Sequence, residues 1–338
     1  MRSVHPLCAI IATIVIPFGV SAATARGQCA SDIDQLNGTD SIDLAILLAT
    51  HGTDGGEHPR ADINGDGVVD FADLAHLLAG WGPCPPPLPW ATTLEQDPDP
   101  LVVTDKAIRT RMIETNLPWR VRDNATGIEM LLVPPGSFTM GASPGDAEAA
   151  PDEHPSHEVT LTSAFYLGRT EVTQAIWLAE MGSNPSYFTG DLDHPVEYVS
   201  WNAVRVFCVQ NELQLPTEAQ WEYACRAGDT TPRYGPLDEI AWNFANSEQM
   251  THPVATKLPN GFGFYGTIGN VSEWCSDFGG PYSEGSATDP TGPATGIFRV
   301  LRGGAWISQS SSCRASFRAQ SAQTVVTPAS GFRVARNP

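Results

Sequence analysis

The sequence has little positive charge and few charged residues of either sign. Lysine and arginine together number 19 against 38 acidic residues, which gives a formal net charge of −19 over 338 residues. Because a chain of this charge repels phosphates, nucleic acid is excluded as a class of partner. Charged residues make up only 17 % and hydrophobic residues 41 %, so a packed core is expected and global disorder is not. The length suggests roughly two domains.

Long apolar runs are missing after the N-terminus. Beyond residue 25 no stretch reaches the ~18 apolar residues that a membrane helix needs. Within residues 1–25, Arg2 precedes an apolar run from Leu7 to Ile16, and small residues follow up to Ala25. This order is typical of a signal peptide, and the alternative is a buried N-terminal helix. We therefore expect an exported protein, periplasmic, cell-surface or extracellular, with no membrane span.

Six cysteines remain after the expected cleavage, and an even number in an oxidising compartment favours disulfides. They are Cys29, Cys84, Cys208, Cys225, Cys275 and Cys313. From residue 118 onward, no Ser-His-Asp order, phosphate loop or clustered metal-ligand spacing stands out. His154 and His157 could form a pair of metal ligands, but they lie in a Pro/Glu-rich loop, so we interpret them as surface residues.

An acidic repeat occupies the N-terminal third, where residues 29–100 carry 13 acidic side chains against the single Arg60. Residues 32–52 return as 62–82 with a period of 30. The second copy has the ligand pattern of an EF-hand-type calcium loop, with a turn glycine at its sixth position. The expected calcium ligands are Asp62, Asn64, Asp66, the Val68 carbonyl, Asp70 and Asp73. The alternative is a polar turn before a helix, and the first copy lacks a carboxylate and the turn glycine.

Two such loops, each followed by a helix, resemble the type I dockerin module over about residues 29–84. The resemblance implies a small α-helical calcium-binding module that tethers the protein to a cohesin-like scaffold protein. Cys29 and Cys84 bracket this module, and a disulfide between them would hold its ends together. Prolines dominate the next residues, so we expect residues 85–117 to be an extended linker followed by a short helix capped by Thr104 or Asp105.

The remaining residues, 118–338, read as one irregular, loop-rich α+β domain. We expect strands at 119–123 and 128–133 and helices at 173–181, 202–211 and 217–226. Thr217 and Gln220 have the spacing of a capping box at the start of the last helix. Seven of the nine tryptophans fall in this part of the chain and are expected to anchor its core.

A series of motifs in this domain resembles the formylglycine-generating enzyme, or sulfatase-modifying factor, superfamily. The motifs are residues 130–141 (MLLVPPGSFTMG), 171–174 (EVTQ), 194–201, 215–224 (LPTEAQWEYA), 269–274 (GNVSEW), 301–306 (LRGGAW) and 331–334 (GFRV). The resemblance covers about residues 118–338 and implies a divergent C-type-lectin-like fold. It does not fix the activity, because the superfamily includes members with other oxidations and members without known catalysis.

The resemblance also raises the question of whether the domain is an oxidase. The enzyme oxidises a sulfatase cysteine to formylglycine with O₂ and a copper(I) ion held by two cysteines, and these positions fall on Ser308 and Cys313. Serine is a poor ligand for copper(I), and Ala305 replaces the serine of the Gly-Gly-Ser motif. We therefore expect a domain that binds a ligand or protein. The alternatives are a formylglycine-generating oxidase for exported sulfatases that uses only Cys313 and the substrate thiol, or another oxidase on the same scaffold.

Calcium sites and cysteine pairs of the family are also altered. Gly266 replaces an Asp or Asn of one calcium site, while Asn246 matches a ligand of the other. Asn270 and Glu273 are interpreted as structural hydrogen-bonding residues. Cys208 and Cys225 lack the partners that the family has. For Cys275 and Cys313, a disulfide and two free thiols are equally favoured.

Overall fold

The computed structural model describes residues 33, 41–54, 58–79 and 88–338. The expected signal peptide, both Cys29 and Cys84, and residues 32 and 34–40 of the first acidic repeat lie outside these residues. Among the described segments, no helix combines the length and the apolar character that a membrane crossing requires.

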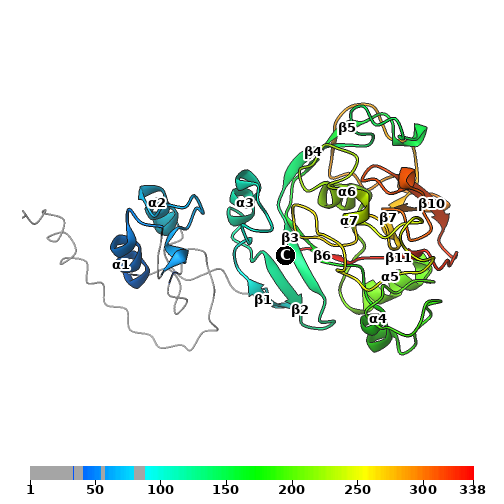
Figure 1. Cartoon of the computed structure of the whole chain (residues 1–338), viewed down its shortest axis with the longest axis horizontal. Helices are drawn as coiled ribbons and strands as arrows, with labels where there is room; N and C mark the ends of the chain where they lie inside the picture. Colours follow the sequence, from blue (N-terminus) through cyan, green and yellow to red (C-terminus); the bar gives the residue numbers. More distant parts are fainter. Residues whose placement is uncertain (1–32, 34–40, 55–57, 80–87) are drawn as a thin grey trace, which may run out of the picture.

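The acidic repeat forms two short helices that pack on each other, α1 (Ser41–Thr50) and α2 (Phe71–Ala79) (Figure 1). A 3₁₀ helix, η3 (Pro59–Ala61), comes before the second loop. The small core between them contains Leu47 of α1 and Leu77 of α2, together with Val69 from the loop, and all three are fully buried. The period of 30 residues thus corresponds to one loop and one helix.

The large domain contains three small sheets. The first sheet has five strands in the order β1 (Ala91–Glu95), β2 (Arg120–Asp123), β3 (Glu129–Val133), β6 (Phe165–Gly168) and β12 (Ala335–Arg336). The second has four, in the order β10 (Arg318–Ala322), β9 (Phe298–Arg302), β7 (Ser272–Phe278) and β11 (Ser330–Gly331). The third has three, in the order β4 (Gly136–Met140), β5 (His157–Leu161) and β8 (Ala287–Thr288). The mixed α/β architecture agrees with the α+β prediction.

Four of the five described helices of the large domain begin at a residue whose side chain caps them. The helices are α3 (Lys106–Ile113), α4 (Gln174–Met181), α5 (Trp201–Gln210), α6 (Glu218–Arg226) and α7 (Leu237–Ile240). Asp105, Thr173 and Ser200 cap α3, α4 and α5, each by accepting a hydrogen bond from a backbone amide of the first turn. Thr217 and Gln220 form the predicted capping box of α6.

The linker prediction is wrong for part of its range. Residues 91–95 form the edge strand β1, which pairs antiparallel with β2, with Ala91 opposite Asp123 and Thr92 opposite Arg122. Arg120 of β2 also binds the Glu95 side chain at 2.5 Å. Composition alone did not indicate this strand, because its partner lies about 30 residues further along the chain.

Aromatic side chains form the centre of the main core, as predicted. Trp177 of α4 stacks on Phe207 of α5 with a centroid distance of 5.5 Å, and Phe332 packs edge-on against both. A second core lies where α6 packs against β7 and β9 (Figure 1). Trp221, Cys225, Cys275 and Cys313 are all buried in this second core. The segment that carries Ser308 follows directly after β9.

Candidate functional site

Two glycines after β9 determine the backbone conformation that leads into the candidate site. Gly303 and Gly304 have φ angles of +89° and +73°, which favour glycine. A side chain at Gly304 would lie 2.7 Å from the Ser312 carbonyl and 3.2 Å from the Cys313 sulfur. The amide of Gly269 also donates a hydrogen bond to the Gly303 carbonyl at 2.9 Å. The glycines therefore bring the turn that follows them into contact with Cys313.

Ser308 closes that turn. Its Oγ accepts a hydrogen bond of 2.9 Å from the Ala305 amide, and its own amide donates one of 2.8 Å to the Ala305 carbonyl. The carbonyl of Ser308 accepts from the amide of Phe244 at 3.0 Å. The Ser308 hydroxyl is thus part of the backbone framework of the turn.

Cys313 lies just after a 3₁₀ helix, η5 (Ser310–Ser312), and is fully buried. Burial raises the pKa of its thiol to about 12, while the nearby Arg233 acts in the opposite direction. Arg233 donates from Nε to the Cys313 carbonyl at 2.9 Å. Since the thiolate is the reactive and metal-binding form, burial disfavours the form of Cys313 that would react or bind a metal.

Of the two alternatives that the sequence left open for Cys275 and Cys313, the structure has the two free thiols. The two residues lie in the same core, but each has a free thiol. The Cys275 sulfur faces the Glu273 carbonyl at 4.0 Å, whereas the Cys313 sulfur packs beside Gly304. The two sulfurs therefore have different close neighbours in the second core. Cys208 and Cys225 are also buried free thiols.

Asn246, which matches a family calcium ligand by resemblance, and Glu273 both make internal hydrogen bonds. Asn246 donates from Nδ2 to the Ala241 carbonyl and accepts at Oδ1 from the Asn243 amide. Glu273 binds Arg333 through both carboxylate oxygens at 2.7 Å and accepts from the Trp221 indole. These contacts agree with a structural role for Glu273.

Glu171, from the EVTQ motif, occupies the space beside Gly266. A side chain at Gly266, whose φ is +61°, would meet the Glu171 carboxylate. One carboxylate oxygen accepts from Nδ2 of Asn270 at 3.0 Å, and the other is buried without a hydrogen-bond partner among the described residues. Burial first, and then the proximity of Glu273, raise the pKa of Glu171 to about 7 although Arg333 opposes the shift.

The predicted calcium loop has the turn geometry that its sequence indicates. Asp62 accepts hydrogen bonds from the amides of Asp66 and Gly67, and Gly67 has a φ of +89°. Asp73, fully buried, accepts from the amides of Asn64 and Asp70. Side-chain oxygens are the donors that a hard cation prefers. Even so, within the described ranges no three His, Cys, Asp or Glu side chains gather closely enough to hold a metal ion.

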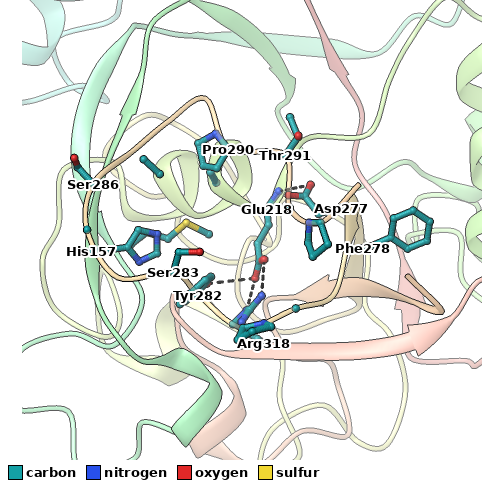
Figure 2. Close-up of a pocket in the computed structure, with 18 residues that line it drawn as sticks. His157, Glu218, Asp277, Phe278, Tyr282, Ser283, Ser286, Pro290, Thr291 and Arg318 are labelled. Atoms are coloured by element: carbon teal, nitrogen blue, oxygen red, sulfur yellow. Dashed lines mark hydrogen bonds and ion pairs between the residues drawn. The ribbon is translucent and has the colours of Figure 1, made fainter. Parts of the chain in front are cut away.

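A cavity of about 360 Å³ lies under the loop that connects β7 to β9. Figure 2 shows Glu218 at its wall, where the carboxylate binds Arg318 at 2.6 and 2.8 Å and accepts from the Tyr282 hydroxyl at 3.3 Å. The Glu218 amide donates to Asp277 at 2.9 Å. His157 packs edge-on against Tyr282. The charged and polar side chains described here bind one another, so we interpret them as stabilising the structure of the cavity wall.

Buried ion pairs connect α6 to the strands around the site, and the sequence analysis missed them. Arg302 of β9 binds Glu218 at 3.0 Å and also Glu222, and Arg226 binds Glu222 at 2.8 Å. Arg302 and Glu222 are both completely buried. The sequence does hold a signal for this network. Glu218 and Glu222 lie four residues apart among apolar residues of a predicted helix, and buried carboxylates need positively charged partners.

Comparison with known proteins identifies the relatives of the large domain. A model of the sulfatase-modifying factor enzyme 1-like domain matches residues 118–338. The formylglycine-generating enzyme of Streptomyces coelicolor is 32 % identical over 277 residues, covering 61 % of this chain and 88 % of that enzyme.

Solved structures give the same result for the fold. PvdO from Pseudomonas aeruginosa matches with a TM-score of 0.60 at 26 % identity, over 65 % of this chain and 98 % of that one. Treponema denticola variable protein 1 matches with a TM-score of 0.57 at 29 % identity, over 62 % and 95 % of the two chains. Because the family model covers well over half of the sequence, the chain belongs to the family of proteins with a sulfatase-modifying factor enzyme 1-like domain.

Proposed function

We propose that the formylglycine-generating-enzyme-like domain of this protein binds a ligand or a partner protein and does not oxidise cysteine to formylglycine. The observation that carries the proposal is Ser308, which stands where the resemblance puts the first copper-binding cysteine. Its hydroxyl already accepts the Ala305 amide and closes the turn.

The residues present do not fit copper(I). This soft ion selects thiolates, and the two positions offer one hydroxyl oxygen and one thiol. The thiol of Cys313 is fully buried, and burial raises its pKa to about 12, so the thiolate is disfavoured. Deprotonation would have to accompany metal binding, which lowers metal affinity at neutral pH.

The surface beside the same turn favours binding of a partner. Ile307 and Phe244 are each 53 % exposed, and the amide of Phe244 binds the Ser308 carbonyl. Tyr187 is 69 % exposed and packs edge-on against Phe188, which in turn packs against Trp306. Exposed apolar side chains grouped around one loop are typical of an interaction site.

The test is the affinity of the purified full chain for copper(I), measured by competition with a chromogenic chelator. We expect the Ser308→Cys variant to bind at least about a hundredfold more tightly than the parent, because it restores a second thiolate. Cys313→Ser in the Ser308→Cys background is the control and should remove the gain. Equal, tight binding by the parent and Ser308→Cys would overturn the proposal.

The second candidate is a formylglycine-generating oxidase. It is favoured by the 32 % identity to the Streptomyces coelicolor enzyme over most of that enzyme's length. In this alternative, Cys313 and the thiol of the bound substrate together provide the two sulfur ligands. Repeating the copper(I) measurement with a Cys-x-Pro-x-Arg peptide separates the two candidates, because only the alternative requires tighter copper binding in the presence of the substrate peptide.

For the N-terminal module, we propose calcium binding and attachment to a cohesin-like scaffold outside the cytoplasm. The oxygen donors between Asp62 and Asp73 and their spacing support calcium. The signal-peptide pattern of residues 1–25 supports export. The two helices of the repeat would then display the binding surface of the tether.

A further inference from the structure

An open groove of about 640 Å³ lies between α5 and the start of α6. Trp201 and Arg205 of α5 line it together with Arg299 of β9. Its apolar wall is made by Val209, Leu213 and Leu215. The groove is separate from the turn at Ala305–Ser308, and neither Ser308 nor Cys313 lines it.

Two arginines in this groove lack a charged partner. Within the described part of the chain, neither Arg205 nor Arg299 forms an ion pair, whereas Arg302 and Arg318 next to them in the fold do. Acidic residues are abundant in this chain, whose net charge is −19, yet none of the described ones pairs with these two arginines. The groove therefore presents two arginines that have no ion-pair partner among the described residues.

Arg299 is held in place while part of its guanidinium stays unsatisfied. Its guanidinium lies 3.7 Å from the Trp201 ring centroid and 3.4 Å from that of Phe278. One terminal nitrogen donates to the Ser276 carbonyl at 2.5 Å, but Nε is buried without a hydrogen-bond partner among the described residues. An unsatisfied buried donor is costly unless something binds to it.

Arg205 lies near the same tryptophan, with its guanidinium 6.0 Å from the Trp201 ring centroid. Burial and the charge of Arg205 both lower the pKa of Arg299, and Asp277 only partly offsets this. The Asp277 carboxylate is already bound to the Glu218 amide and the Ser276 hydroxyl. An anion between the two arginines would relieve their mutual repulsion.

Amide side chains complete the polar edge of the groove. Oε1 of Gln220 is used by the α6 capping box, which leaves its Nε2 group as a donor. Asn337 accepts from Gln214 at Oδ1 and likewise retains its Nδ2 donors. A groove of this size also exceeds what a simple ion needs, so the apolar wall is available to the body of a larger molecule.

We propose that this groove binds an organic oxyanion, with its carboxylate, sulfate or phosphate group between Arg205 and Arg299 and its apolar part against Trp201 and Val209. Arginine presents paired N–H donors that match the oxygens of these groups. The proposal is independent of the absence of oxidase activity, because no residue of the turn at Ser308 takes part.

The test is isothermal titration of the full chain at low ionic strength with benzoate, phenyl sulfate and phenyl phosphate, and with neutral benzamide. We expect saturable binding of at least one anion, no binding of benzamide, and weaker binding at high salt. The preferred anion identifies the headgroup chemistry. If all three anions bind no better than benzamide, the proposal is wrong.

The matched variants are Arg205→Gln and Arg122→Gln. Arg205 is exposed, so its replacement should leave the thermal midpoint unchanged while weakening anion binding about tenfold. Arg122 on β2 is 51 % exposed and does not line the groove, so Arg122→Gln removes the same charge without effect on binding. Arg205→Lys should bind with intermediate affinity because it keeps the charge and loses the paired donors. Equal effects of Arg205→Gln and Arg122→Gln would overturn the assignment.

Discussion

The hydroxyl of Ser308 accepts a hydrogen bond from the Ala305 amide at 2.9 Å, in a turn whose other side touches the buried Cys313 through Gly304. Both family copper positions therefore serve the packing of this turn. The serine fixes its backbone, and the cysteine fills the core below it. The predictions that follow test this packing, the buried charges around it and the N-terminal loop.

Replacing Gly304 by alanine should destabilise the domain more than the same change at Gly145. The two glycines have almost equal φ angles, +73° and +75°, so both variants suffer similar backbone strain, about 1–3 kcal/mol. Only at Gly304 does the new methyl group meet the Ser312 carbonyl and the Cys313 sulfur, because nothing lies within 4 Å of a side chain at Gly145. Urea unfolding of both variants measures the difference. Equal losses would mean that the close approach to Cys313 is unimportant.

Removing the charge of Glu222 should cost far more than removing that of Glu95. Glu222→Gln leaves the buried guanidinium of Arg302 without one of its two carboxylates, which costs about 3–5 kcal/mol. Glu95, whose side chain is 37 % exposed, binds Arg120 near the surface, and its replacement should cost less than about 1 kcal/mol. Free energies of unfolding from urea titrations provide the comparison. Similar values for the two variants would contradict the structural role given to the network.

Stability should decrease as the pH rises through about 7, and Glu171 should contribute to this. Its pKa is about 7 in the folded protein and 4.5 as the ordinary value. The folded state therefore holds a proton that the unfolded state releases, and the stabilisation, complete at low pH, is lost as the pH approaches and passes 7. Glu171→Gln keeps an acceptor for Asn270 and should flatten the profile of the thermal midpoint between about pH 5 and pH 8. An unchanged slope in the variant would show that Glu171 ionises normally.

Calcium should order the N-terminal module, and two carboxylates of the second loop should be required. In the full chain, we expect calcium to change the circular dichroism and to raise the first unfolding transition. Asp62→Ala combined with Asp66→Ala should abolish both effects, because it removes two of the five side-chain ligands. Asp54→Ala with Asp99→Ala, which changes the net charge equally outside the loop, is the control. A calcium response that survives in the Asp62/Asp66 double variant would place the ion at another site.

Local features were predictable from the sequence, and long-range ones were not. The Thr217–Gln220 capping box and the strands beside residues 124–127 follow from short-range chemistry, and the structure confirms them. The edge strand β1 escaped prediction because its only signal is the distant β2 with which it pairs. The orientation of Cys275 depends on the packing of β7 against α6, so no spacing in the sequence could decide between a thiol and a disulfide.

The candidate site divides in the same way. Ser308 could be identified from the motif around it, yet its bond to Ala305 appears only in the folded turn. The groove with Arg205 and Arg299 joins residues 94 positions apart in the numbering, on a helix and a strand that sequence motifs do not relate. That Arg205 and Arg299 lack a charged partner could not be predicted from the sequence, because only the fold decides which acidic residues lie near them.

The central claim is tested most directly by mass spectrometry of a peptide that contains Cys-x-Pro-x-Arg after incubation with the full chain, copper(I) and O₂. The Streptomyces coelicolor enzyme serves as the positive control. The account predicts that the peptide cysteine stays unmodified with this protein while the control converts it. Conversion of the cysteine to the aldehyde by the wild-type chain would contradict the account and establish the oxidase.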